Sequence, residues 1–217
     1  MTKKTRQLIS RAAAIDASLA IIDKEGLDAL SIRRLARELG VGTMTLYSYF
    51  QNKEELLDQI ALQVVGNICE PQSPKGTWDV RLTQIMKRLH SIMLEHPGIG
   101  TLTISRRNPI AALDPFREVV LSILHDAGFP VRDAVNALTA LATYVTGYSI
   151  VEHSRTDAQV DTERKRLAQL PKDQFPNLSA SSRHYAAQIS RQAFEFGLRS
   201  LIKGLALELE ALEERKK

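Results

Sequence analysis

The sequence is poor in the residues and motifs that carry most catalytic and metal chemistry. Its single cysteine, Cys69, cannot form an internal disulfide, which suits a reducing compartment such as the cytoplasm. Its five histidines do not follow the spacing of zinc ligands. The sequence also lacks a glycine-rich phosphate loop, a nucleophile elbow and a paired-carboxylate signature. We therefore expect no cofactor, no metal and no enzymatic activity.

Strand patterns and targeting segments are missing as well. No segment alternates between apolar and polar residues, so an all-α chain is expected. No continuous apolar stretch follows the basic N-terminus, so no signal peptide is expected. Residues 134–151 carry no charge and approach the length of a membrane span, but they contain polar side chains such as Asn136 and Thr139. We interpret them as a buried helix at a subunit interface of a cytoplasmic protein without a membrane partner.

The positive charge of the chain is confined to its first quarter. Residues 1–53 hold nine Lys and Arg against five Asp and Glu, a net charge of +4, which equals the net charge of the whole chain. The remaining residues are therefore neutral in sum. A basic module joined to a neutral one is the electrostatic pattern of a nucleic-acid-binding domain with a separate partner domain.

Local signals in this first quarter predict a helix-turn-helix. Ser31 is a suitable N-cap, Gly40 accepts the positive φ of a tight turn, and Asn52 caps the next long helix. The second helix of such a motif enters the major groove of DNA. The expected helices cover about 32–39, 42–48 and 53–68, after a first helix that ends at Gly26. We expect a three-helix DNA-binding domain over residues 1–53, a connecting fourth helix, and a separate helical domain over 69–217.

The third helix has one apolar face and one face of hydroxyls. Val41, Leu46 and Phe50 anchor it, which leaves Gly42, Thr43, Met44, Thr45 and Tyr47 nearer the outer face. Base edges come within reach at the N-terminal end of such a helix, and the hydroxyls of Thr45, Tyr47 and Tyr49 can donate hydrogen bonds to phosphates. Lys53 adds a cation at the start of the fourth helix, where backbone N–H groups already favour an anion.

The stretch AAAIDASLAIIDKEGLDALSIRRLARELGVGTMTLYSYFQNKEELL resembles the DNA-binding domain of the tetracycline-repressor (TetR) family of bacterial regulators. The matching features are EGLDALSIRRLA, the LGV turn, TLYSYF and NKEELL. The resemblance implies a homodimeric repressor of a palindromic DNA operator, released by a small-molecule effector of unknown identity. It implies that the helical domain over 69–217 binds the effector and forms the dimer. It also implies base contacts by Arg33 and Thr43 and phosphate contacts by Ser31 and Tyr47. With the residues above, the expected DNA-binding set is Ser31, Arg33, Thr43, Met44, Thr45, Tyr47, Tyr49 and Lys53.

The rest of the chain predicts further helices after the loop EPQSPKGT. Their expected ranges are about 78–94, 98–105, 109–127, 131–153, 178–185 and 188–214, and residues 154–178 are expected to form a long, mobile connection that is in part helical. In the last helix Gly197 and Gly204 share a face and would let another helix approach closely. The expected dimer interface is Leu138, Val145, Gly197, Leu201, Gly204 and Leu205, although a monomeric core would explain the same pattern.

A small-molecule pocket is expected among the middle helices. Tyr144 and Tyr148 lie one turn apart on an uncharged helix, so their hydroxyls need partners if they are buried, and a ligand could supply one. Plain core packing is the alternative for every candidate. A regulator controlled by a protein partner, without a small ligand, is the alternative function. The candidate lining residues are Leu89, Met93, Leu102, Phe116, Val120, Leu141, Tyr144 and Tyr148.

Overall fold

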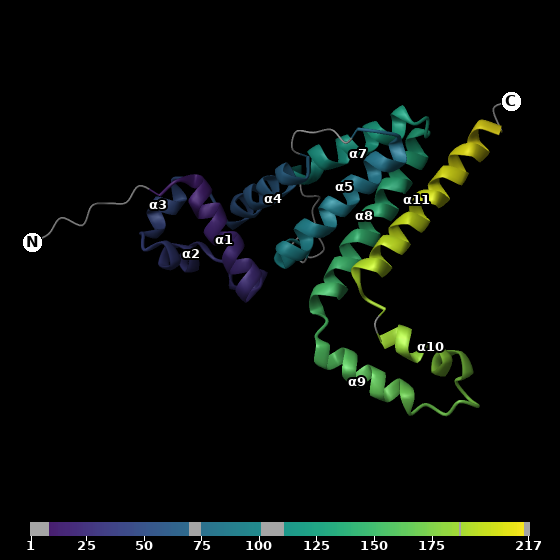
Figure 1. Cartoon of the computed structure of the whole chain (residues 1–217). Helices are drawn as coiled ribbons and strands as arrows, with labels where there is room; N and C mark the ends of the chain where they lie inside the picture. Colours follow the sequence, from purple (N-terminus) through teal and green to yellow (C-terminus); the bar gives the residue numbers. More distant parts are fainter. Residues whose placement is uncertain (1–8, 70–74, 101–110, 187, 215–217) are drawn as a thin grey trace, which may run out of the picture. The chain divides into compact units, whose positions relative to one another are not determined.

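The computed structural model describes residues 9–69, 75–100, 111–186 and 188–214, and all regular structure in these ranges is helical (Figure 1). This confirms the all-α fold class. The elements are α1 (Arg11–Glu25), η1 (Leu27–Ala29), α2 (Ile32–Leu39), α3 (Thr43–Tyr47), α4 (Lys53–Cys69), α5 (Trp78–Glu95), η2 (Ala111–Leu113), α7 (Asp114–Asp126), α8 (Val131–Ser154), α9 (Asp157–Ala168), α10 (Pro176–Ala186) and α11 (Arg191–Glu214).

The described residues divide into two compact units. The N-terminal unit contains residues 9–69, 95–100 and 111–122, and the C-terminal unit contains residues 75–94, 123–186 and 188–214. The segment after α5 thus belongs with the N-terminal helices. The sequence-based division of the chain at a single boundary does not anticipate this return. The predicted boundary near residue 69 stays a prediction.

In the N-terminal unit the expected caps and turn set the helix-turn-helix. The Ser31 side chain accepts a hydrogen bond from the Arg34 N–H at 3.1 Å, and Gly40 ends α2 in the left-handed conformation with φ of 66°. Asn52 Oδ1 accepts the Glu55 N–H at 2.8 Å at the start of α4. Leu46 and Phe50 are fully buried, so α3 is anchored by the side chains that the sequence indicated. These local contacts fix the path from α2 into α3.

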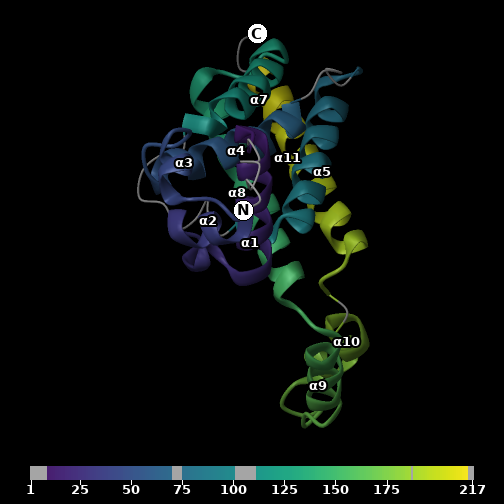
Figure 2. The same ribbon diagram turned by 90° about the vertical axis from the view of Figure 1, so that its left-hand side faces the viewer.

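In the C-terminal unit α8 and α11 run side by side, as both views show (Figures 1 and 2). The interval 154–178, expected to be a long connection that is in part helical, contains α9 and the start of α10. Thr156 and Gln159 form a reciprocal capping box at the start of α9, and Leu167 is fully buried. The two short helices pack against each other as a hairpin between α8 and α11.

Among the described residues one helix, α8, is long and apolar enough to cross a membrane by length and composition, with a mean hydropathy of 1.2. The core helix of a helical unit meets the same criteria, so the observation is weak evidence for a span. One side of α8 is covered by its own chain. The buried residues are Ala134, Ala137, Leu138, Leu141, Val145 and Ser149.

Candidate functional site

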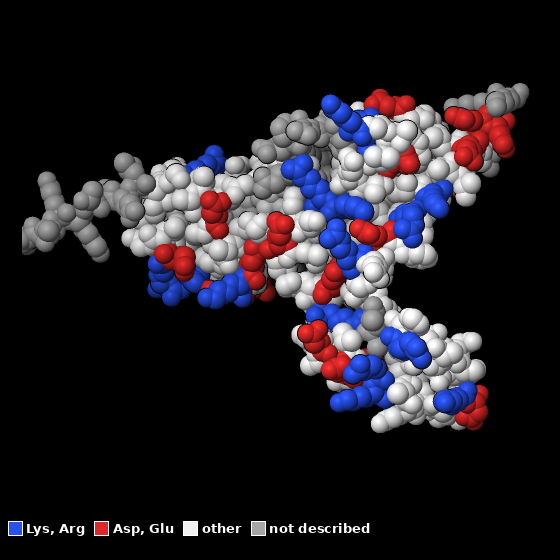
Figure 3. Space-filling view, viewed as in Figure 1, with Lys and Arg blue, Asp and Glu red and all other residues white. Residues whose placement is uncertain are grey.

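Helix α3 presents an uncharged surface to solvent. Met44 is 78% exposed and Tyr47 is 49% exposed, and Thr43 beside them is exposed as well. Thr45 is only half-buried, between the exposed face and the anchored one. In the space-filling view the surface over α3 carries no charged side chains, whereas Lys and Arg gather nearby over α2 (Figure 3). A neutral reading surface beside a basic one suits base edges flanked by phosphates.

The two adjacent arginines of α2 have different surroundings. Arg34 Nη2 lies 2.6 Å from Glu25 Oε1, and Arg34 Nη1 lies 2.6 Å from Glu38 Oε2. The hydrogen bond from Arg34 lowers the pKa of the Glu25 carboxyl, and the two carboxylates raise the pKa of Arg34. Arg33 points into solvent and has no ion pair within the described part of the chain. Of these two arginines, Arg33 is therefore the one whose guanidinium is available to a ligand.

Two predicted phosphate contacts have partners within the chain. The Tyr49 hydroxyl donates to the Ile9 carbonyl oxygen at 2.5 Å, so its proton is already engaged. The expectation that this hydroxyl donates to a phosphate therefore does not fit the geometry. The Lys53 ammonium lies 3.4 Å from the Leu27 carbonyl oxygen. An ammonium group has three donors, so Lys53 keeps the capacity to bind a phosphate.

The predicted dimer residues fall into two groups. Val145 is fully buried and Leu138 is 9% exposed within a single chain, so a partner copy has nothing to cover at Val145. That part of the prediction is wrong because α8 turns this side toward its own core. Gly204 is exposed, and a Cβ there would meet no atom within 4 Å. Leu201 and Leu205 are half-buried, so part of each side chain remains accessible to a partner copy.

Gly197 serves contact within the chain. A Cβ on Gly197 would overlap the Tyr144 hydroxyl and lie 2.6 Å from Tyr144 Cζ. The glycine therefore allows α11 to approach α8 of the same chain. The neighbouring helix at Gly197 is α8 of its own protomer, whereas a Cβ at Gly204 would meet no atom of the chain within 4 Å.

The two tyrosines of α8 already have hydrogen-bond partners at the start of α11. The Tyr144 hydroxyl donates to the Phe194 carbonyl oxygen at 3.0 Å. The Tyr148 hydroxyl donates to the Ser190 carbonyl oxygen at 2.8 Å and accepts from the Ser190 N–H at 2.9 Å. Burial raises the pKa of both phenols. The chain itself therefore supplies the partners that, in the prediction, a ligand could supply.

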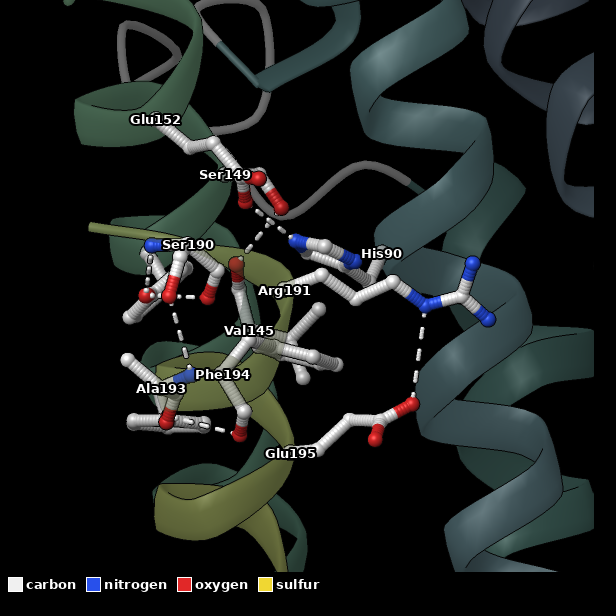
Figure 4. Close-up of polar contacts among 11 residues, drawn as sticks. His90, Val145, Ser149, Glu152, Ser190, Arg191, Ala193, Phe194 and Glu195 are labelled. Atoms are coloured by element: carbon white, nitrogen blue, oxygen red, sulfur yellow. Dashed lines mark hydrogen bonds and ion pairs between the residues drawn. The ribbon is translucent and has the colours of Figure 1, made fainter. Parts of the chain in front are cut away.

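A buried histidine lies next to these tyrosines. His90 on α5 stacks on Phe194 with ring centroids 3.7 Å apart, and its Nε2 lies 2.8 Å from Glu152 Oε2 (Figure 4). In the N-terminal unit His96 Nδ1 lies 2.8 Å from Asp23 Oδ2 in the same way. The sequence does not indicate which carboxylates pair with these histidines, because the partners lie far away along the chain. Within the residues described, no three His, Cys, Asp or Glu side chains gather as a metal site would require.

The remaining pocket candidates are mostly core residues. Phe116 and Val120 are buried in the N-terminal unit, and Met93 and Leu141 are buried in the C-terminal unit. Leu89 is half-buried, and Leu102 lies outside the described residues. The C-terminal unit has a groove of about 370 Å³ between α8 and α11. None of the residues that line this groove was predicted as a pocket residue. The groove is lined by Phe129, Asp133, Asn136, Ala137, Ala140, Leu205, Glu208 and Leu212.

A helix-turn-helix with an exposed reading helix, joined to a separate helical unit, defines a DNA-binding transcriptional regulator. Comparison with known proteins identifies the family of this regulator. The family model described as "Tetracyclin repressor-like, C-terminal domain" matches residues 70–209, and the model of bacterial regulatory proteins of the tetR family matches residues 14–60. The chain belongs to the tetracycline-repressor family.

Individual relatives agree over nearly the whole chain. The HTH-type transcriptional repressor DrrR1 of Streptomyces coeruleorubidus is 31% identical over 208 residues, which cover 88% of this chain and 75% of the relative. The tetracycline repressor protein class D of Escherichia coli is 27% identical over 206 residues, covering 94% of this chain and 92% of the relative.

Solved structures match the fold at similar identity. Apo ActR from Streptomyces coelicolor has a TM-score of 0.81 at 28% identity, covering 96% of this chain and 100% of ActR. ActR in complex with actinorhodin has a TM-score of 0.77 at 29% identity, covering 91% of this chain and 95% of that one.

Proposed function

We propose that the protein is a cytoplasmic repressor that binds a palindromic operator as a homodimer and is released by a small organic effector. The exposed, uncharged face of α3 beside Arg33, which has no ion pair among the described residues, is the observation that carries DNA reading. Within this proposal Arg33, Thr43 and Met44 face base edges, and Ser31, Thr45, Tyr47 and Lys53 bind phosphates. The protein acts by binding, without turnover.

Effector release is supported by the separate helical C-terminal unit and by the complex of ActR with actinorhodin. A ligand can bind more tightly to a conformation in which the spacing of the two α3 helices does not match the operator. Such a ligand shifts the population of dimers away from the DNA-binding conformation. To lower the operator-binding fraction of the protein from about 99% to about 1%, the ligand must bind the non-binding conformation more favourably by about 5.5 kcal/mol. Control by a protein partner is the less favoured alternative, because ligand-bound relatives support a sensor.

Selection from random duplex DNA with the purified protein tests this function directly. A two-fold symmetric dimer should return an inverted repeat, because its two α3 helices enter major grooves about one turn or a multiple of a turn apart. A screen of organic compounds for release of that duplex then tests the sensor. Recovery of no consensus would contradict DNA reading, and a recovered operator with no release by any compound class would favour the protein partner.

The dimer is proposed to form through one side of α8 together with α11. The exposed residues of α8 between 135 and 151 carry no charge, and on α11 Phe196 is 64% exposed and Leu207 is 66% exposed. Such a charge-free, partly apolar surface is typical of an interface. Two of the groove residues belong to it, so the groove opens toward the proposed partner. The exposed α8 residues are Val135, Asn136, Thr139, Ala140, Thr143, Gly147 and Val151.

Gly204→Leu is expected to weaken the dimer. Gly204 has open space within its own chain, so a leucine side chain there would meet the partner and not its own core. Overpacking costs about 1–3 kcal/mol per site, and symmetry applies the cost twice. Sedimentation equilibrium should show a higher dissociation constant with an unchanged helical spectrum. Gly66→Leu, at an equally open glycine of α4, is the matched control. A monomeric wild type at micromolar concentration would contradict the proposed dimer.

A further inference from the structure

Helix α3 lacks the side chains that pair with three of the four bases. Residues 41–49, which contain α3, read VGTMTLYSY and include no arginine, lysine, asparagine, glutamine, aspartate or glutamate. In the major groove arginine and lysine bind guanine, asparagine and glutamine bind adenine, and carboxylates accept from cytosine. Hydroxyl groups both donate and accept, so they discriminate little between base edges. The feature that remains for selective readout by α3 is the C5-methyl group of thymine, which apolar side chains contact.

Met44 is the long apolar side chain that α3 presents to solvent. It is 78% exposed, the highest value among the large apolar side chains of the described residues, whereas Leu46 of the same helix is fully buried. Met44 lies beside the exposed Thr43 and three residues before Tyr47, within the part of a helix-turn-helix that contacts base edges. Its unbranched thioether has three rotatable bonds, so it can adapt to a methyl group in the groove.

We propose that Met44 determines specificity for thymine, because its side chain contacts the C5-methyl group of one thymine in each half-site. The inference rests on the proposed operator binding and names the base pair that α3 selects. The two helices of the motif then divide the readout. Arg33 on α2 offers donors to a guanine, and Met44 on α3 offers an apolar contact to a thymine. Each selected half-site should therefore contain a T·A pair beneath α3.

Removal of single methyl groups from the operator tests the contact. The probe is the duplex selected by the wild type, with one thymine of each half-site replaced in turn by uracil, which lacks only the methyl group. Loss of one buried methyl group corresponds to about a fourfold change in affinity, so the symmetric pair of replacements should weaken binding about 15-fold at the contacted position. Uracil in the flanks outside the half-sites is the matched control. No loss at any thymine of the half-site, or a half-site without thymine, would overturn the proposal.

A mutant cycle between protein and DNA assigns the contact to Met44. Met44→Ala removes the apolar side chain at an exposed position, so the fold should be kept. This variant should bind the thymine and uracil duplexes equally, whereas Met44→Leu, which keeps an apolar side chain of similar size, should still prefer thymine. Thr43→Ala is the matched control at the neighbouring exposed position and should also keep the preference. A preference for thymine that survives Met44→Ala would overturn the assignment.

5-Methylcytosine separates the methyl group from the rest of thymine. A C·G pair at the contacted position should weaken binding by the wild type, and 5-methylcytosine should restore part of the affinity, because it carries a methyl group at the same place in the major groove. Met44→Ala should bind these two duplexes equally. Equal binding of both by the wild type would overturn the proposal. A wild type that selects no duplex would instead overturn the proposed function.

Discussion

Gly197→Ala is expected to destabilise the C-terminal unit. The added methyl would overlap the Tyr144 hydroxyl and lie 2.6 Å from Tyr144 Cζ. This tyrosine cannot move aside cheaply, because its ring stacks on Phe194 and its hydroxyl donates to the Phe194 carbonyl oxygen at 3.0 Å. Overpacking of this kind costs about 1–3 kcal/mol. For a chain of this size that corresponds to a fall in Tm of about 2–4 °C per kcal/mol.

Thermal unfolding at one fixed protein concentration measures this effect, since dimerisation makes Tm depend on concentration. Gly66→Ala is the matched control, because Gly66 is also helical and a Cβ there would meet no atom within 4 Å. Helix propensity alone predicts that alanine stabilises such a site by up to about 1 kcal/mol. If Gly197→Ala behaves like the control, the close approach of α11 to α8 at this point is not tight.

Arg33→Ala is expected to relax the base preference at one position of each half-site. The Arg33 guanidinium is exposed and unpaired within the described residues, so its two-pronged donor set can reach a guanine edge. Such a contact contributes about 1–3 kcal/mol of discrimination, which corresponds to about tenfold for every 1.4 kcal/mol. Selection from random DNA with the variant should return a consensus that is degenerate at that position.

Arg37→Ala is the matched control for charge, because it removes an exposed arginine from the same helix. It should weaken binding to all sequences alike, if at all, and leave the consensus unchanged. Arg34→Ala is a second control, because it removes the ion pairs to Glu25 and Glu38 and leaves Arg33 in place. An unchanged consensus for Arg33→Ala would contradict the assignment of Arg33 to a base contact.

The fold of the first quarter could be predicted because its determinants are local. Ser31 caps a helix whose first turn follows it directly, and Gly40 ends the same helix in a conformation that glycine tolerates best. The apolar spacing of Leu46 and Phe50 also indicated the anchored face of α3 correctly. None of these inferences needs a partner more than a few residues away in the chain.

The side-chain partners could not be predicted because they are distant in sequence. Arg33 and Arg34 look equivalent until Glu25 is brought beside Arg34 by the turn at Gly26. The Tyr148 hydroxyl meets Ser190, 42 residues away, and His90 meets Glu152, 62 residues away. The bounds of α9 were not predicted because its composition is polar, and its capping box was the signal that could have revealed its start.

The α9–α10 hairpin also marks where this chain can vary in evolution. Its two helices pack on each other, α9 provides its own cap through Thr156 and Gln159, and Leu167 fills its small core. The register of α8 against α11 is set elsewhere, by the bonds from Tyr144 and Tyr148 to the backbone of α11. Insertions and deletions between residues 157 and 186 can therefore lengthen, shorten or replace the hairpin without sliding one long helix along the other, so natural length variation should concentrate there.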